Sequence, residues 1–371
     1  MKSKIIKLEM FKAKISNKTN WVFLKLINDQ NLTGWGELTL QGKENELFKI
    51  KDIIFSKIIN IEYKTPYELK KLLPYKNIIE SAISSSIMQA LWDIQGKLEN
   101  KTIGSLFGSK NDKVEIYANF NRSTIDRTIQ GIISKTIQVK DDQYKFIKFA
   151  PFDEVEPSMS KKAFNSALDL GLKRINAIKD TLGKKIKVLI DCHWRFNFGN
   201  ALQLIKECEA FDLYWIECPL IENLENLNDI KVLRSKANHL GIKLAGLEKG
   251  ILREGFFQYL KNGSYDVMMP DIKYAGAPDE MLDIHKVFRK YSVEFSPHNP
   301  SGPISHAHTL QVCSAINEKI LMEYQFKESP FFETLLEKPN PKIIRGQSYI
   351  PNHCAGAGVT INEKALSLVV K

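Results

Sequence analysis

Acidic residues and one histidine recur along the second half of the chain, each at or just after a short apolar run. They are spaced 23 to 31 residues apart, about the length of one strand followed by one helix. In parallel α/β folds, ligand-binding residues emerge where the strands end. The spacing therefore predicts that six side chains meet at one end of a barrel: Asp191, Glu217, Glu248, Asp271, His298 and Glu323.

The first three of these residues predict a metal site. They end three consecutive strands, so Asp191, Glu217 and Glu248 would bring three carboxylates to one side of the barrel mouth. Three anions in one place repel one another and need a cation. Oxygen ligands with room for water and substrate select Mg²⁺ over zinc, so we predict a Mg²⁺ site with these three ligands.

The other three residues predict acid–base chemistry and substrate binding. His298 would lie beside Asp271 on the neighbouring strand. A carboxylate that orients an imidazole holds it in one tautomer and raises its pKa, so this pair is the predicted general base. Glu323 ends the eighth strand, diametrically opposite the fourth, so the substrate is expected to lie between Glu323 and the metal.

Two further side chains are expected to reach the same mouth. Lys148, at the end of the second strand, would flank the metal, where its ammonium form is disfavoured and acid–base work becomes possible. A lysine that clamps a phosphate or carboxylate is the alternative interpretation. His193 lies two residues beyond Asp191, so the alternation of a strand turns it into the mouth and turns Cys192 away.

Eight strand-like runs, most of them separated by helix-length segments, must position these side chains. They occupy residues 114–120, 144–150, 187–193, 213–219, 242–248, 265–271, 292–298 and 319–325. Eight parallel strands that alternate with helices are typical of a TIM barrel. A loop rich in Pro and Gly follows the seventh run, and we expect His306 and His308 beyond it to be helix-capping or surface groups.

The first 112 residues have a different pattern, which predicts a separate domain. Residues 4–40 resemble a β-meander, and residues 45–100 turn helical with one apolar stripe: Ile83, Ile87, Ala90, Leu91 and Ile94. We therefore predict an α/β protein with three parts. These are an N-terminal α+β capping domain at 1–112, a TIM-barrel catalytic domain at 113–344, and a C-terminal segment at 345–371 that packs back on the capping domain.

Composition limits the classes of function and partner. The 371 residues are 43% hydrophobic, enough for one large barrel and a smaller domain. The net charge of +10 comes from scattered lysines, so we expect no nucleic-acid partner and a surface that attracts a small anionic substrate. Five cysteines without CxxC spacing, and no apolar run of membrane-spanning length, predict a cytoplasmic protein without a membrane partner. We also expect a homo-oligomer.

Longer motifs at these positions resemble the enolase superfamily, in its mandelate racemase/muconate lactonizing enzyme branch. TGWGEL at 33–38 resembles the N-terminal hairpin of that family, ALWDIQGKLENKTIGSLFG the helix that leads into its barrel, and HCAGAGVTI its C-terminal segment. Its strand ends resemble LIDCHWR, YWIECPL, AGLEKG, MMPDIKYAGAPDE and SPHNPSGPIS. The Asp-x-His at 191–193 and the PHNPSGPI loop are most similar to sugar-acid dehydratases of the galactonate type.

The resemblance implies a role for each candidate. Asp191, Glu217 and Glu248 would be the Mg²⁺ ligands, His298 with Asp271 the general base, Glu323 the hydrogen-bond partner of the substrate carboxylate, and His193 the general acid. Enolase-superfamily sites combine a Lys or His base with Mg²⁺. The implied reaction abstracts the proton α to a carboxylate through an enediolate and then expels the β-hydroxyl. That is a Mg²⁺-dependent acid-sugar dehydratase, a carbon–oxygen lyase that forms a 2-keto-3-deoxy sugar acid.

Three positions depart from the family pattern. Phe146 replaces the first lysine of the Lys-x-Lys motif of the racemases, which puts the role of Lys148 as a second base in question. Cys218 replaces a second glutamate and Leu247 replaces a glycine, and both changes alter the surroundings of the metal. In this family the N-terminal domain closes over the mouth, here through residues 16–20 and 40–43. Two alternatives stay open: a racemase or epimerase of a 2-hydroxy acid in the same superfamily, and a non-catalytic barrel that binds a sugar acid.

Overall fold

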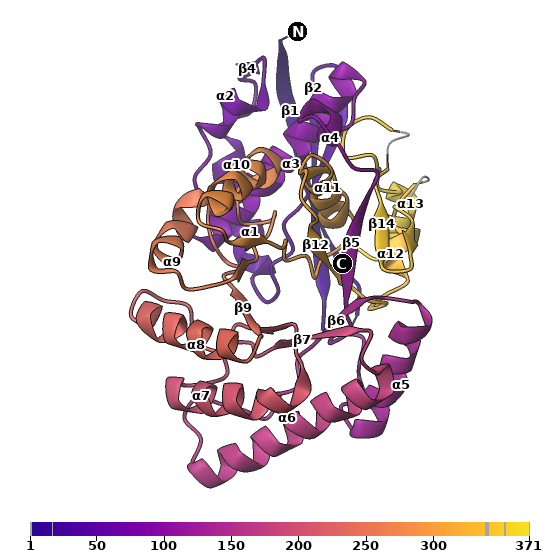
Figure 1. Ribbon diagram of the computed structural model, residues 1–371. Helices are drawn as coiled ribbons and strands as arrows, with labels where there is room; N and C mark the ends of the chain where they lie inside the picture. The colour runs from indigo at the N-terminus through magenta and orange to yellow at the C-terminus, as the bar shows by residue number, and fades with distance from the viewer. Residues whose placement is uncertain (1, 17, 338–340, 352–353, 371) are drawn as a thin grey trace.

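The computed structural model describes residues 2–16, 18–337, 341–351 and 354–370. The N-terminal part, at the top of Figure 1, combines four helices with an antiparallel sheet in the order β3-β2-β1-β4. The strands are β1 Ser3–Lys14, β2 Asn20–Asn28, β3 Thr33–Glu37 and β4 Glu62–Tyr63. The helices are α1 Glu44–Phe55, α2 Pro66–Lys70, α3 Ile78–Glu99 and α4 Ile103–Leu106. The predicted meander is confirmed.

Eight parallel strands then form the barrel, which confirms the predicted fold class. Consecutive strands pair from β5 to β11, and β12 returns to pair with β5. They are β5 Lys113–Asn119, β6 Phe146–Phe149, β7 Lys187–Asp191, β8 Trp215–Glu217, β9 Lys243–Gly246, β10 Val267–Met268, β11 Glu294–Phe295 and β12 Leu321–Gln325. The helices between them are α5 Ile129–Asp141, α6 Lys161–Leu182, α7 Phe198–Glu207, α8 Leu227–His239, α9 Phe257–Asn262, α10 Ala277–Lys290 and α11 Pro303–Ser314.

Alternation along the strands divides the barrel's apolar side chains between two cores. Outward-facing residues such as Ile147 and Ile216 pack against the surrounding helices. A smaller inner layer fills the barrel itself: Tyr117, Leu189, Trp215, Ala245, Val267 and Met269. Among the described residues, no helix is long and apolar enough to cross a membrane.

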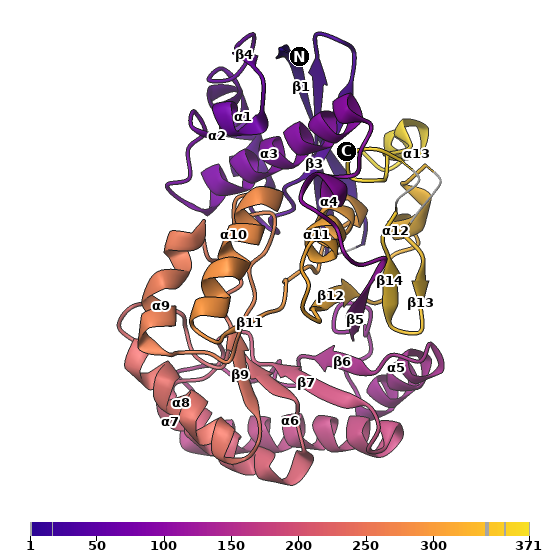
Figure 2. The same cartoon turned by 45° about the horizontal axis from the view of Figure 1, so that its top comes forward.

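Helix α3 joins the N-terminal sheet to the barrel and is more deeply buried than its sequence suggested. The five residues of the predicted stripe are buried, but so are Ser84, Ser85 and Gln89 between them. Gly34 of β3 explains the close packing, because a Cβ there would come within 2.1 Å of the carbonyl oxygen of Ala90. On the other side, α3 faces the barrel helix α10 (Figure 2), so a one-sided apolar stripe describes only one of its two contacts.

The end of the chain lies beside the N-terminal part (Figure 1, yellow). Strand β14 (Gln347–Tyr349) pairs with β5 and with β13 (Ile343–Ile344), which follows the short helix α12 (Phe331–Thr334). Beyond it, the amide of Ile103 donates to Gly356 and that of Lys14 donates to Val369, next to α13 (Glu363–Ser367). The C-terminal segment therefore contacts both the barrel and the N-terminal part, and the domain boundaries stay a prediction.

The two histidines of α11 correct the sequence interpretation. His306 and His308 are completely buried rather than capping or exposed, because α11 lies between the barrel and the N-terminal part. The ring of His306 contacts Ser348 and Asn299, and burial lowers its pKa to about 3. Both imidazoles are structural groups of a buried helix.

Candidate active site

The register of the barrel places two of the predicted metal ligands side by side. Asp191 and Glu217 are the last residues of β7 and β8 and pair directly across the ladder. Glu217 also lies next to β9, where it is opposite Ala245. Glu248 lies two residues beyond the end of β9, so a turn rather than the strand carries it.

A cavity of about 670 Å³ opens at this end of the barrel, beneath the N-terminal part. Five of the eight predicted site residues line it: Lys148, Asp191, His193, Glu248 and His298. The other three are fully buried: Glu217, Asp271 and Glu323. The N-terminal part contributes Lys18, Thr19, Leu40 and Gln41 to the wall, and these residues belong to the two segments that were expected to close over the mouth.

Lys148 occupies the centre of the carboxylate group and is 1% exposed. Its Nζ lies 2.6 Å from Glu217 Oε1, 2.9 Å from Glu323 Oε1 and 3.7 Å from Asp191 Oδ2. Burial lowers the pKa of Lys148, but Glu217 and Glu323 outweigh burial and raise it well above its usual value. These carboxylates therefore favour the ammonium form of Lys148.

The buried carboxylates have the chemistry of a divalent-cation site. Burial, with Asp191 and Glu323 as like charges, raises the pKa of Glu217 well above its usual value despite the contact with Lys148. The second oxygen of Glu217 accepts a hydrogen bond from Trp215 Nε1 at 3.1 Å. Such a concentration of oxygen donors fits a hard cation, which would relieve the mutual repulsion.

A thiol adjoins these carboxylates. Among the described residues, Glu217, Cys218 and Glu248 form one group whose potential metal-binding atoms lie within 4.8 Å of one another. Burial raises the pKa of Cys218 well above its usual value, so the thiol stays protonated. Of the atoms in this group, the carboxylate oxygens of Glu217 and Glu248 are the donors that a hard cation such as Mg²⁺ prefers.

The predicted pair of the general base His298 with Asp271 is formed. His298 Nδ1 lies 2.7 Å from Asp271 Oδ2, and its Nε2 lies 3.1 Å from Glu248 Oε2. Burial lowers the pKa of His298, but the charges of Glu248 and Glu323 and the bond to Asp271 raise it above its usual value. Asp271 accepts at Nδ1, so in the neutral ring the lone pair is on Nε2 and faces the cavity.

Lys273 belongs to the same site, and the sequence interpretation missed it. Its Nζ donates to Asp271 Oδ2 at 2.6 Å and to the hydroxyl of Ser301, and its amide donates to Asp271 Oδ1 at 2.9 Å. The side chain is 1% exposed and lines the cavity. A signal existed, because Lys273 lies two residues beyond Asp271, the same interval that drew attention to His193.

Glu323 is surrounded by donors rather than open to the cavity. Asn119 Nδ2 donates to its Oε1 at 2.7 Å, and the amide of Asn299 donates to its Oε2 at 2.9 Å. Burial raises the pKa of Glu323, but Lys148 and His298 outweigh it and lower the pKa. This carboxylate is ionised and holds Lys148, and its contact with a substrate stays a prediction. Nothing in the sequence alone identified Asn119 or Asn299.

His193 reaches the mouth for a different reason from the one predicted. β7 ends at Asp191, and His193 has a left-handed backbone with φ of 48°, so strand alternation does not extend to it. The turn brings its Nε2 to 3.0 Å from Asp191 Oδ2 and leaves the side chain 39% exposed. The charge of Asp191 raises the pKa of His193, which favours the imidazolium form.

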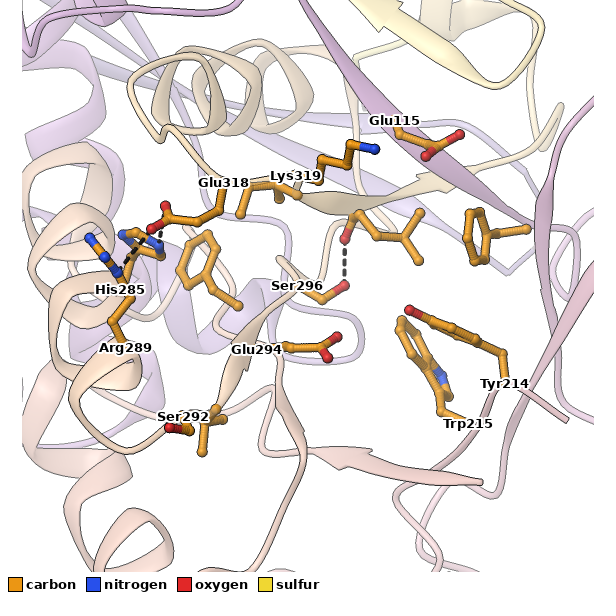
Figure 3. Close-up of a pocket in the computed structure, with 15 residues that line it drawn as sticks. Glu115, Tyr214, Trp215, His285, Arg289, Ser292, Glu294, Ser296, Glu318 and Lys319 are labelled. Carbon is orange, nitrogen blue, oxygen red and sulfur yellow. Dashed lines mark hydrogen bonds and ion pairs between the residues drawn. The ribbon is translucent and has the colours of Figure 1, made fainter. Parts of the chain in front are cut away.

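A second cavity, of about 430 Å³, lies at the opposite end of the barrel, where the strands begin (Figure 3). Its walls include Tyr214, Trp215 and Phe295, and Glu318 pairs with His285 and Arg289 at its edge. None of the predicted site residues lines it. Trp215 links this cavity to the candidate site, because its Nε1 donates to Glu217 Oε2.

Comparison with known families matches both parts of the chain. Residues 9–108 match the mandelate racemase/muconate lactonizing enzyme N-terminal domain. Residues 134–365 match the family described as enolase C-terminal domain-like. The matches cover the N-terminal part and most of the barrel with the end of the chain.

Curated relatives align along almost the whole chain. A D-xylonate dehydratase of Haloferax volcanii is 25% identical over 93% of this chain and 84% of its own. A D-galactonate dehydratase of Xanthomonas campestris pv. campestris is 27% identical over 93% of this chain and 90% of its own. A D-galactonate dehydratase of Pectobacterium atrosepticum is 25% identical, with 93% and 89% covered.

Solved structures share the fold. An enolase superfamily member from Salmonella Typhimurium superposes with a TM-score of 0.87 at 21% identity, covering 98% of both chains. The 3,6-anhydro-D-galactonate cycloisomerase of Zobellia galactanivorans superposes with a TM-score of 0.85 at 23% identity, covering 99% of both chains. At these identities the likeness describes the fold.

Proposed function

The chain belongs to the enolase superfamily, in its mandelate racemase/muconate lactonizing enzyme branch, and on that premise we propose that it is a Mg²⁺-dependent dehydratase of an acid sugar. The observation that carries this proposal is the arrangement around one cavity. The proposed general base His298, held by Asp271, and a second histidine, His193, flank the group of buried carboxylates. The dehydratase names of the relatives support the same reaction class.

Asp191, Glu217 and Glu248 are the residues that would hold the metal. When bound, Mg²⁺ would supply positive charge beside the substrate carboxylate and so make the α-proton more acidic. Asp191 and Glu217 end β7 and β8, Glu248 lies in the turn after β9, and the pKa of Glu217 is raised by burial and by like charge. The ammonium of Lys148 lies against two of them from the barrel side.

His298 is the proposed base. In its neutral form it takes the α-proton at Nε2, while Asp271 holds the Nδ1 proton and the orientation of the ring. The electron pair of the broken C–H bond enters an enediolate. Lys273 keeps Asp271 ionised: burial raises the pKa of that carboxyl, but Lys273 and His298 outweigh burial and lower it.

His193 is the proposed acid. The enediolate electrons form a new double bond between the α- and β-carbons as the β C–O bond breaks. His193 gives its proton to the departing hydroxide, which leaves as water, and the resulting enol becomes a 2-keto acid. The Nε2 of His193 lies 3.0 Å from Asp191 Oδ2, and that charge favours the protonated form that this step needs. Its 39% exposure leaves room for contact with a ligand.

Lys148 favours a dehydratase over a racemase. A two-base racemase needs a free base on the face opposite His298, whereas Lys148 is 1% exposed and its Nζ is paired with Glu217 Oε1 at 2.6 Å and Glu323 Oε1 at 2.9 Å. Phe146, in place of the first lysine of the racemase motif, has its ring beside Tyr214, near the other end of the barrel. Lys148 fits the alternative role of a fixed positive charge toward a carboxylate.

The proposed substrate is a small anionic sugar acid, as the names of the relatives suggest. Positive side chains predominate in the cavity wall and favour such an anion: Lys18, Arg122, Arg127, Lys148, Lys249 and Lys273. Hydroxyl and amide groups, such as those of Thr39 and Asn121, can bond to the sugar hydroxyls.

A library of aldonic and aldaric acids tests this proposal. Each acid is incubated with the protein and Mg²⁺, and 2-keto acid formation is measured. At least one acid should be converted, and exhaustive chelation should abolish the conversion until Mg²⁺ is restored. Undiminished turnover after chelation would refute metal dependence, and inversion at the α-carbon without any keto acid would identify a racemase instead.

A further inference from the structure

Glu222, five residues beyond Glu217, bonds to four different segments around the candidate site. Its Oε2 accepts a hydrogen bond from Trp194 Nε1 at 3.0 Å. Its Oε1 accepts from the hydroxyl of Tyr265 at 2.8 Å and from the amide of Leu247, and the Cys218 thiol lies 3.7 Å away. One carboxylate therefore links the ends of β7, β8 and β9 to the start of β10.

Three of these four partners are sequence neighbours of proposed functional residues. Trp194 follows His193, Cys218 follows Glu217, and Leu247 precedes Glu248. Main-chain hydrogen bonds connect the same turns. The amide of Trp194 donates to the carbonyl oxygen of Cys218 at 2.7 Å, and the amide of Cys218 donates to the carbonyl oxygen of Ala245 at 3.0 Å. A shift in any one turn would therefore move a functional side chain.

The three neighbours also adopt a conformation that needs support. Trp194, Cys218 and Leu247 have φ values of 57°, 45° and 67°, in the left-handed region that residues other than glycine seldom occupy. Such strain persists where the surrounding structure imposes it, and it gathers at functional sites. Glu222 bonds directly to all three residues, which supplies that support.

The fit around Glu222 is close. A Cβ on Gly246, the last residue of β9, would come within 2.5 Å of Glu222 Oε1. The absence of a side chain there lets the carboxylate approach the strand end next to Leu247. Burial is the largest cause that raises the pKa of Glu222 to about 7, and Glu248 adds a like charge from the metal side.

We propose that Glu222 is a positioning residue that fixes the three turns carrying His193, Glu217 and Glu248, and thereby sets the affinity of the site for Mg²⁺. This inference rests on the proposed function, because the metal ligands are the ones proposed there. Glu222 acts through the backbone neighbours of those residues. Groups that orient metal ligands from outside the ligand shell typically change metal affinity by about 10–100-fold when they are removed.

Isothermal titration of the purified, metal-free protein with Mg²⁺ tests this role. Glu222→Ala removes all four contacts and should weaken Mg²⁺ binding about 10–100-fold. Glu222→Gln keeps an oxygen for Leu247 and Tyr265 and loses only the acceptor for Trp194, so its affinity should fall in between. Glu225→Ala is the control, because Glu225 is an exposed carboxylate of the same loop and its loss should leave the affinity unchanged.

The outcomes separate this inference from the function on which it rests. A wild-type protein that binds no Mg²⁺ would overturn both. If the wild type binds Mg²⁺ and Glu222→Ala binds it within about threefold, only the positioning role is overturned. Should Glu222→Ala fail to fold, Glu222→Gln decides: weakened binding with an unchanged unfolding temperature supports the role, and wild-type affinity overturns it.

Discussion

The two ends of the barrel carry charge in different ways. Where the strands end, Lys148 is 1% exposed and contacts three carboxylates at once. Where they begin, Glu294 pairs with Lys243 and Glu318 with Arg289, and these four side chains stay 31% to 66% exposed around an aromatic pocket. The same eight strands build both ends.

Burying the charges at the strand ends lowers the stability of the fold, whereas the exposed pairs at the other end do not. Removing ionised groups from water is expensive, and a buried pair often contributes less than apolar residues of the same size. An exposed pair contributes only about 0–1 kcal/mol and costs little to form. Concentrated buried charge at one end therefore indicates selection for binding and chemistry, whereas the other end has the features of a structural surface.

The largest contrast is expected when the same substitution is made at both ends. Glu217→Gln removes a proposed metal ligand and should lower kcat/KM by about 10³-fold or more while the fold stays intact. Glu294→Gln should leave kcat/KM unchanged, because the Glu294 carboxylate pairs with Lys243 at the end of the barrel where the strands begin. Steady-state kinetics and circular dichroism of both variants measure this. Equal losses of kcat/KM in the two variants would contradict the assignment of the reaction to the strand ends.

Histidines give the next largest contrast. His193→Asn should cut 2-keto acid formation by about 10²–10⁴-fold, because the leaving hydroxide loses its acid. Exchange of the α-proton with deuterated water should survive, since the base remains. His285→Asn at the other end is the control and should change neither rate. If His193→Asn dehydrates within about threefold of wild type, the acid role passes to Lys148 or His298.

Lys273 should control the pH dependence. The pKa of His298 is raised, and a base works only when neutral, so kcat/KM should rise with pH through a midpoint above the usual imidazole value of about 6.5. Lys273→Met leaves Asp271 less compensated, which favours the imidazolium and moves the midpoint to higher pH. Ser301→Ala, which removes only a neutral partner of Lys273, is the control. A shift to lower pH would contradict this account.

Trp215 connects the two ends and should show an intermediate effect. Trp215→Phe keeps an aromatic ring in the barrel but leaves Glu217 Oε2 without its donor. The unsatisfied buried oxygen should lower the free energy of unfolding by about 1–3 kcal/mol and reduce activity modestly. Denaturant unfolding and kinetics check this, with Tyr214→Phe as the neighbouring control. An unchanged free energy of unfolding would mean that the hydrogen bond from Trp215 to Glu217 does not stabilise the fold.

The smallest effect is expected at the exposed pairs. Arg289→Ala removes the ion pair with Glu318, and both side chains are more than 40% exposed. The free energy of unfolding should change by less than about 1 kcal/mol, with activity unchanged. A loss of activity in Arg289→Ala would show that the second cavity, where the strands begin, is coupled to the reaction.

The sequence predicted the barrel because its hydrophobic runs recur at the length of one strand and one helix. It also brought His298 and Asp271 into one pair, since neighbouring strand ends are close in space. The same logic failed for His193, whose position depends on a left-handed turn and not on strand alternation. Residues just past a strand end follow local turn geometry, which spacing does not encode.

The partners of the site were harder to predict than the site itself. Asn299 and Lys273 reach it by loop paths whose contacts only the folded structure defines. His306 was placed at the surface because a Pro- and Gly-rich loop precedes it, whereas the N-terminal part covers its helix. Burial by a distant segment of the chain is a tertiary property that local sequence does not carry.

The proposed role of His298, at the end of the barrel with buried charge, is to abstract an α-proton. Its most direct test is proton NMR of a converted sugar acid in deuterated water with Mg²⁺, comparing wild type with His298→Asn. We expect wild type to exchange the α-proton and form the 2-keto acid, and the variant to do neither, with an unchanged unfolding temperature. Exchange by His298→Asn at the wild-type rate would contradict the claim.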